Sequence, residues 1–109
     1  MQHMLRYAIA LIVVMTGSAK AADIQLYAAG SLRAALTDVG NAFAGATGHR
    51  VLEKFGPSGV LKDEIDADAR ADVFASANME YPQALNLARK SGPVTLFARN
   101  KLCAMAKPD

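Results

Sequence analysis

Two serines in this sequence have a setting that suits anion binding. Ser31 lies in the turn Ala29-Gly30-Ser31-Leu32 and Ser58 in the turn Gly56-Pro57-Ser58-Gly59, each between an apolar, strand-like run and a helical pattern. A helix N-terminus presents unpaired backbone N–H groups and the positive end of the helix dipole, which attract negative charge. Neither turn contains Lys or Arg. We therefore expect the turns to hold an oxyanion by hydrogen bonds from hydroxyls and backbone N–H groups rather than by ion pairs.

Each serine also has a simpler interpretation as a helix cap, because a serine hydroxyl accepts readily from the free N–H groups of a first turn. We expect Ser31 to cap the helix that follows it. A catalytic role is weaker, since Ser31 lies outside a G-x-S-x-G motif and His49, the single histidine after residue 21, is expected on a solvated loop. The patterns G-x-x-x-x-G-K-[ST] and G-x-G-x-x-G are absent from both turns, which excludes a nucleotide site there.

Strand and helix patterns alternate along the chain and position both serines. Apolar runs predict strands over 24–28, 51–55, 71–75, 94–97 and 102–106. Helical patterns follow the first three strands: one ends at Gly48, one carries Val60, Leu61 and Ile65 inward, and one runs over about 80–90 with Leu85 and Leu87 as apolar positions and Gly92 as its stop. This alternation predicts an α/β fold, a three-layer sandwich with a largely parallel sheet. Ligands of such sheets lie beyond the carboxyl ends of strands, where both serine turns stand.

Residues 1–21 have the pattern of a cleavable signal peptide. A basic segment over 1–6 precedes an apolar run over 7–15, and Ala19-Lys20-Ala21 gives an A-x-A cleavage site. The apolar run is far shorter than the roughly 20 residues of a membrane-spanning helix, which disfavours a membrane anchor. We expect residues 22–109 to form the mature chain, exported to the periplasm.

The formal net charge of +2 belongs to the predicted signal peptide, because residues 22–109 hold ten basic and ten acidic residues. A near-neutral chain without a Lys/Arg run gives no sign of a nucleic-acid partner. A solvated helix face is expected for the acidic group Asp63, Glu64, Asp66 and Asp68. Cys103, the single cysteine, lies in an apolar run and is expected to be a buried core thiol. No Cys/His spacing suggests a metal ligand set, so we expect neither a metal nor a cofactor.

Four segments occur in the order and spacing of the periplasmic molybdate-binding proteins, namely 27–32 (YAAGSL), 55–59 (FGPSG), 71–78 (ADVFASAN) and 97–102 (FARNKL). The third segment is the most specific of the four. Over nearly all of 23–108 the sequence resembles that family. The resemblance implies the solute-binding component of an ABC importer, with a type II periplasmic-binding fold whose two lobes close on molybdate or tungstate.

The resemblance also implies roles for single residues. In that family the serines that match Ser31 and Ser58 contact the anion through hydroxyl and backbone N–H groups, and the remaining contacts come from the second lobe. Residues 22–109 would then be the N-terminal lobe, without the second lobe, of a monomeric protein that delivers its ligand to a membrane permease. Pro57 departs from the serine-rich run of many members and removes one N–H donor.

Three alternatives stay open from the sequence. The ligand could be another tetrahedral oxyanion, such as sulfate or phosphate. The chain could instead be a small exported serine hydrolase that uses Ser31 or Ser58. It could also be a fragment without an autonomous function, since half a cleft should bind an anion weakly.

Overall fold

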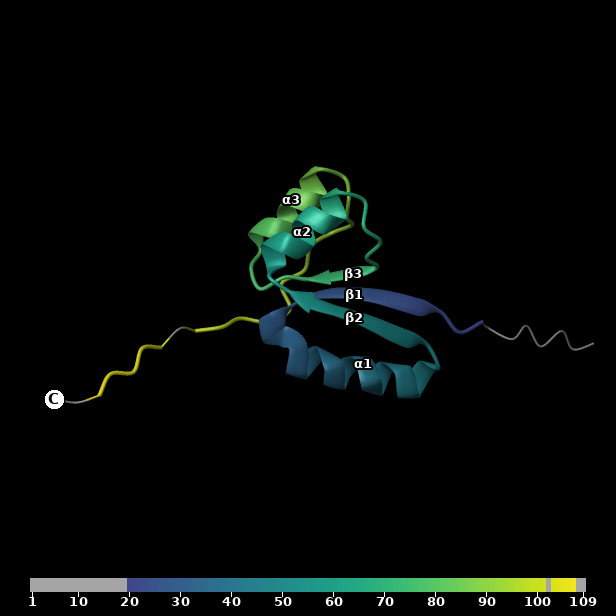
Figure 1. Ribbon diagram of the computed structural model, residues 1–109, viewed down its shortest axis with the longest axis horizontal. Coiled ribbons are helices and arrows are strands. Elements are labelled where there is room, and N and C mark those ends of the chain that lie inside the picture. The colour runs from purple at the N-terminus through teal and green to yellow at the C-terminus, as the bar shows by residue number, and fades with distance from the viewer. Residues whose placement is uncertain (1–19, 102, 108–109) are drawn as a thin grey trace, which may run out of the picture.

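The computed structural model describes residues 20–101 and 103–107, so most of the expected signal peptide lies outside the described residues. The elements follow in the order β1 (Asp23–Ala29), the 3₁₀ turn η1 (Gly30–Leu32), α1 (Arg33–Thr47), β2 (Arg50–Gly56), α2 (Ser58–Asp66), β3 (Val73–Ala75) and α3 (Glu80–Leu87). Figure 1 shows α1 on one face of the sheet and α2 with α3 on the other. The predicted three-layer α/β architecture is confirmed.

The sheet is parallel, as predicted, with the strand order β2-β1-β3. The edge strand β3 is only three residues long, and Asp72 extends its pairing with β1. The Asp72 N–H donates to the Gln25 carbonyl at 2.9 Å, and the Asp72 carboxylate accepts from the Gln25 N–H at 2.8 Å. Asp72 therefore anchors the start of β3.

The core lies on β1 and between α2 and α3. Leu61 of α2 and Leu85 of α3 are each 1% exposed, which confirms the predicted inward position of Leu61, and these two helices contact one another. The prediction for Val60 is wrong, because its side chain is 52% exposed; Leu87, the other apolar position of α3, is 83% exposed. At 3.6 residues per turn, Leu87 lies about 200° around the helix from Leu85, so one neighbouring element cannot bury both.

Two glycines fit α1 to its surroundings. Gly48 ends the helix as predicted, with a left-handed φ of 75° and an N–H that donates to the Ala44 carbonyl at 2.9 Å. Gly40 is buried against β2, where a Cβ atom would come within 2.9 Å of Glu53 Oε1 and 3.6 Å of Val51 Cβ. Helix propensity alone counts Gly40 as a weak point, but its missing side chain allows the close contact between helix and strand.

α3 ends earlier than predicted, and Gly92 is not its stop. Arg89 adopts a left-handed φ of 59°, its N–H donates to the Asn86 carbonyl, and the Lys90 N–H donates to the Leu85 carbonyl, both at 2.9 Å. This pair of bonds is a Schellman ending, which usually has glycine at the left-handed position. Arg89 gives no such signal in the sequence, so the apolar pattern was extended too far.

The segment after α3 differs most from expectation. Among the described residues from 88 onward there is no strand, so the strands predicted over 94–97 and 102–106 are wrong where the structure describes them. An apolar run becomes a strand only where a neighbouring strand pairs with its N–H and C=O groups. Residues 91–100 line a cavity instead, and Cys103 is exposed rather than buried.

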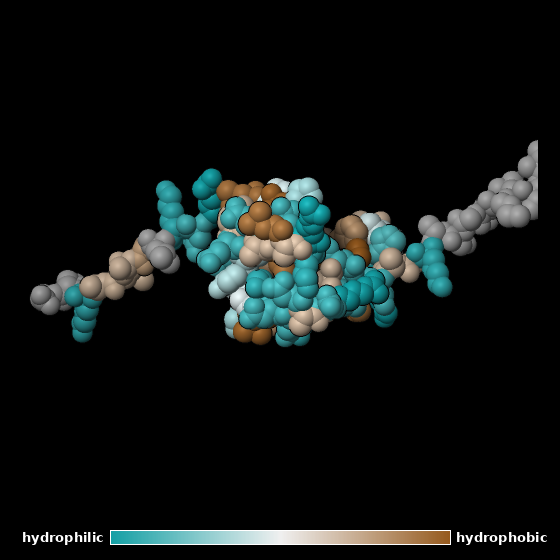
Figure 2. Space-filling view, turned by 90° about the horizontal axis from the view of Figure 1, so that it is seen from above, coloured by the Kyte–Doolittle hydropathy of each residue, from teal (hydrophilic) through white to brown (hydrophobic). Residues whose placement is uncertain are grey.

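The surface of the described residues is mixed in character. Seen from the side of α2 and α3, brown hydrophobic patches are separated by teal hydrophilic side chains (Figure 2). Among residues 20–101 and 103–107, no helix has both the length and the apolar character needed to cross a membrane.

Candidate functional site

The parallel register brings the two serine turns to the same edge of the sheet. Ala29 and Gly56 pair with one another at the ends of β1 and β2. Ser31 and Ser58 each follow two residues beyond this pair. Because paired strands lie about 4.8 Å apart, the two turns begin side by side. The structure thus brings the two turns that carry the candidate serines to the same carboxyl edge, where parallel sheets hold ligands, although only Ser31 lines the cavity found there.

Ser31 lies in η1, and its side chain is exposed. The prediction that it caps α1 is wrong, because Leu32 occupies the N-cap position and no side-chain hydrogen bond caps the helix. The intervening 3₁₀ turn moves the start of α1 past the serine. Ser31 lines a cavity instead, which leaves its hydroxyl accessible to a small molecule.

Ser58 is the first residue of α2, with Pro57 at the N-cap position and no side-chain cap. Its Oγ accepts a hydrogen bond from the Ala77 N–H at 3.0 Å. A serine hydroxyl has one proton to donate, and this bond uses an oxygen lone pair rather than that proton. The O–H of Ser58 therefore remains able to donate, and its oxygen is held in place by the loop that follows β3.

A third serine, Ser76, stands at the carboxyl end of β3, directly after Ala75. Its Oγ accepts from the Asn78 N–H at 3.2 Å, and Asn78 Oδ1 in turn accepts from the Tyr81 N–H at 3.3 Å. These bonds shape the turn between β3 and α3. Sequence reasoning did not select Ser76, although a serine at the end of a predicted strand was the same signal that selected Ser31 and Ser58.

Two packing contacts fix the serine turns. The Arg33 guanidinium lies 4.6 Å from the centre of the Phe55 ring, so the first turn of α1 is joined to the end of β2 by a cation–π contact. On the other turn, a Cβ atom at Gly59 would come within 3.1 Å of the Tyr81 hydroxyl. Glycine at this position allows α2 and α3 to approach closely beside Ser58.

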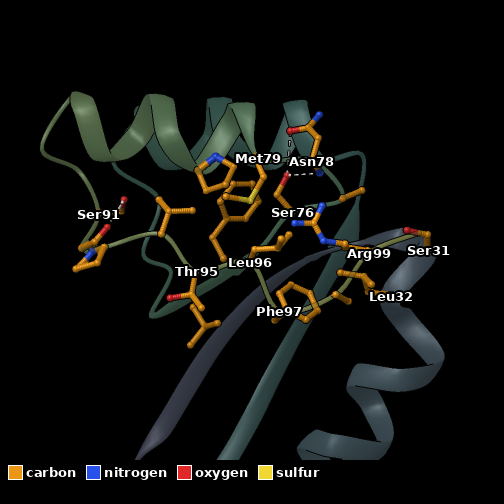
Figure 3. A pocket seen from close by; sticks show the side chains of 18 of the residues that line it. Ser31, Leu32, Ser76, Asn78, Met79, Ser91, Thr95, Leu96, Phe97 and Arg99 are labelled. Atoms are coloured by element: carbon orange, nitrogen blue, oxygen red, sulfur yellow. Dashed lines mark hydrogen bonds between the residues drawn. The ribbon is translucent and has the colours of Figure 1, made fainter. Parts of the chain in front are cut away.

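A cavity of about 700 Å³ opens beside Ser31. Four of its polar lining residues, Ser31, Ser76, Asn78 and Arg99, lie toward one end in Figure 3, and two others, Ser91 and Thr95, lie toward the opposite end. Apolar side chains form much of the remaining wall, namely Leu32, Val73, Phe74, Met79, Val94, Leu96 and Phe97. Cavities of this size hold small-molecule ligands in many proteins.

His49 lies at the opposite end of the sheet from the serines. It precedes β2, its Nδ1 accepts from the Ala22 N–H at 3.0 Å, and its ring stacks on Phe43. The seven residues of β2 separate His49 from the Ser58 turn, a span of roughly 20 Å. His49 lies on the loop between α1 and β2, as predicted, but its side chain is half-buried. At this distance it cannot act as a general base for either serine.

The acidic residues of α2 and of the loop that follows it form ion pairs with nearby lysines. Lys62 lies 2.6 Å from Asp66 one helical turn later, and its hydrogen bond holds the pKa of Asp66 below the ordinary value. Asp63 and Asp68 are largely exposed, at 77% and 92%, as expected for a solvated face. Within residues 20–101 and 103–107 no group of three His, Cys, Asp or Glu side chains could hold a metal ion.

Residues 24–109 match the family described as bacterial extracellular solute-binding protein. The chain belongs to this family. The match covers all described elements except the first residue of β1, so the serine turns lie in a solute-binding fold.

Among relatives of this solute-binding chain, an uncharacterised protein of Pasteurella multocida strain Pm70 is 34% identical over 84 residues, which cover 77% of this chain and 35% of the relative. The molybdate-binding protein ModA of Azotobacter vinelandii is 34% identical over 68 residues, covering 62% and 27%. The chain thus spans about a third of the length of the first relative and about a quarter of the second.

Solved structures show the same fold. The periplasmic molybdate-binding protein of Azotobacter vinelandii superimposes with a TM-score of 0.59 at 29% identity, over 61% of this chain and 29% of that chain. A substrate-binding domain from Clostridium difficile, assigned to a molybdenum ABC transporter, gives a TM-score of 0.61 at 23% identity, over 63% and 31%. The second likeness concerns the fold alone, and both confirm the predicted periplasmic-binding architecture.

Proposed function

We propose that this solute-binding chain holds a tetrahedral oxyanion, molybdate or tungstate, at the carboxyl edge of its sheet. The observation that carries the proposal is the register of Ala29 with Gly56, which brings the turns that carry Ser31 and Ser58 to one edge of the sheet. Both hydroxyls, and the backbone N–H groups at the starts of η1 and α2, would donate to the anion. Likeness to a protein named as molybdate-binding supports this choice of ligand.

The hydrogen bond at Ser58 favours an anion that only accepts. Because Ser58 Oγ already accepts from Ala77 N–H, its hydroxyl meets a ligand best as a donor. Fully ionised molybdate, tungstate and sulfate present acceptors alone, whereas phosphate near neutral pH keeps a proton that must itself be donated. Phosphate is therefore the weaker rival within the oxyanion class, and sulfate is the stronger one.

The transport role follows from the same proposal. A signal peptide over 1–21 would export the chain to the periplasm, residues 22–109 would contribute the N-terminal lobe, and a membrane permease of an ABC importer would receive the anion. We expect the mature chain to act as a monomer without a cofactor or a nucleic-acid partner. Mass spectrometry of the protein recovered from the periplasm should find Ala22 as the first residue, and retention of residues 1–21 would contradict the export step.

Titration of the ¹⁵N-labelled chain with oxyanions, followed by NMR, tests the ligand. Molybdate and tungstate should shift the amide signals of Gly30, Ser31 and Gly59, and sulfate and phosphate should bind at least tenfold more weakly. Ser31→Ala and Ser58→Ala should each weaken molybdate binding by roughly tenfold, the effect of one charge-assisted hydrogen bond. Ser91→Ala, at the far end of the cavity, is the matched control and should change the affinity less than twofold.

Two results would contradict the proposal. Tighter binding of sulfate than of molybdate would show that sulfate is the preferred ligand. Unchanged molybdate binding by both serine variants would show that the anion binds elsewhere than at this edge of the sheet. A serine hydrolase stays a second candidate only if an ester substrate is turned over. Loss of such turnover in Ser31→Ala, with anion binding intact, would favour the hydrolase.

A further inference from the structure

We propose that Arg99 is a further contact of the bound anion and supplies the positive charge that the serine turns lack. This inference rests on the proposed oxyanion function. Sequence reasoning found no Lys or Arg in either turn and expected hydrogen-bond geometry alone to hold the ligand. Arg99 comes from the segment after α3, 68 positions beyond Ser31 in the chain, yet both residues line the same cavity.

The position of Arg99 in the cavity supports its role as an anion contact. Figure 3 draws the Arg99 guanidinium beside Ser76, at the end of the cavity where Ser31 and Asn78 also lie. A guanidinium carries five N–H donors in a planar fork, a geometry that suits two oxygens of one oxyanion.

The charge balance of the cavity leaves Arg99 uncompensated. Asp72 is the only other charged residue among those that line it. The Asp72 carboxylate already accepts from the Gln25 N–H at 2.8 Å and lies 3.7 Å from Arg70 Nη2. The nearest basic residue in sequence to Ser31, Arg33, is outside the cavity lining and lies over the Phe55 ring. An anion at this end would therefore meet the field of Arg99 with little opposition.

Arg99 and the serines would contribute differently to binding: Arg99 to the affinity for the anion, and the serines to the choice between anions. A long, exposed cation attracts every dianion in proportion to its charge and is weakened by salt, because the Debye length falls from about 10 Å at 0.1 M to about 3 Å at 1 M. Hydroxyls and backbone N–H groups fixed by the fold distinguish anions by size and by protonation. Arg99 is thus expected to raise the affinity for molybdate and tungstate alike, without changing the preference between them.

The test compares three variants of the full chain by NMR titration with sodium molybdate at 20 mM and 500 mM NaCl. Arg99→Gln should weaken binding by about fivefold at low salt, the effect expected for a partly exposed ion pair, and by less than twofold at high salt. Arg99→Lys should recover at least half of the lost affinity, since it keeps the charge. Lys101→Gln is the matched control, because Lys101 is exposed and lies outside the cavity lining; it should have less than a twofold effect.

Each outcome decides between the two proposals. If Arg99→Gln binds molybdate as tightly as the parent while Ser31→Ala does not, Arg99 is not a contact and the proposed function stands. A loss that is equal at both salt concentrations, or that Lys101→Gln reproduces, also overturns the Arg99 contact. If the parent chain binds no molybdate at all, the proposed function fails, and the inference fails with it. Circular dichroism of every variant checks that the fold is kept, and Arg99→Lys gives the answer if Arg99→Gln does not fold.

Discussion

Replacing Leu85 and Leu87 by alanine, one at a time, should separate a core position from a surface position within the same turn of α3. Leu85 is 1% exposed and Leu87 is 83% exposed. Full burial of a leucine contributes about 2–3 kcal/mol by transfer, and the cavity left by Leu→Ala raises the cost to about 2–5 kcal/mol. Because Leu85 is covered mainly by one partner helix, α2, we expect a cost of about 3 kcal/mol. Leu87→Ala should stay within about 0.5 kcal/mol.

Urea unfolding followed by circular dichroism measures both values. A domain of about 90 residues has a total stability of about 4–13 kcal/mol, so Leu85→Ala should remove a large share of it. The melting temperature should fall by roughly 12–24 °C for Leu85→Ala and by no more than about 4 °C for Leu87→Ala. The urea dependence of the unfolding free energy should stay the same in both variants. Equal costs for the two leucines, or a cost below 1 kcal/mol for Leu85→Ala, would refute the described packing of α2 on α3.

Three further predictions concern the backbone and pH. Asp72→Ala should cost about 1–3 kcal/mol because it leaves the Gln25 N–H without its acceptor, while Asp72→Asn, which keeps an oxygen, should cost less than half as much in the same urea assay. Arg89→Gly should raise the melting temperature, by roughly 4 °C, because glycine adopts the left-handed φ of 59° without strain; a fall would contradict that ending of α3. Arg50 lowers the pKa of Asp23 by a hydrogen bond, so this pair stabilises the fold above the unfolded pKa of about 3.9 and the effect is lost as the pH falls through the lower folded value. Asp23→Asn should therefore flatten the decline in stability below about pH 4, and an unchanged decline would argue against the pair.

The periodic elements of the fold could be predicted from the sequence, because their signals are local. β1, β2 and α1 follow from an apolar run or a helical stripe, and Gly48 marked the end of α1 through a conformation that glycine favours. The predictions failed where the local structure depends on contacts with another part of the chain. Residues 94–97 are as apolar as a strand but pair with none of the described strands, and the end of α3 at Arg89 uses a residue without a turn signal.

The site could be predicted only in part, for the same physical reason. Ser31 and Ser58 were found because each turn carries its own local pattern, and the parallel register then brings the turns together. Arg99 and the bond from Ala77 to Ser58 depend on tertiary contacts across 68 and 19 positions of sequence. No spacing rule spans such distances, so a sequence can show the turns of a site but not the groups that long-range packing adds to it.

The direction of β1 has a practical consequence for how this protein can be handled. The chain enters the sheet at Asp23, and the candidate site lies at the other end of the strand, after Ala29; Figure 1 shows these ends on opposite sides of the fold. Seven strand residues set the two points roughly 20 Å apart. A linker, fluorophore or sensor surface coupled ahead of Asp23 would therefore leave the serine turns open to solution, whereas coupling through Cys103 would use the segment that follows Arg99.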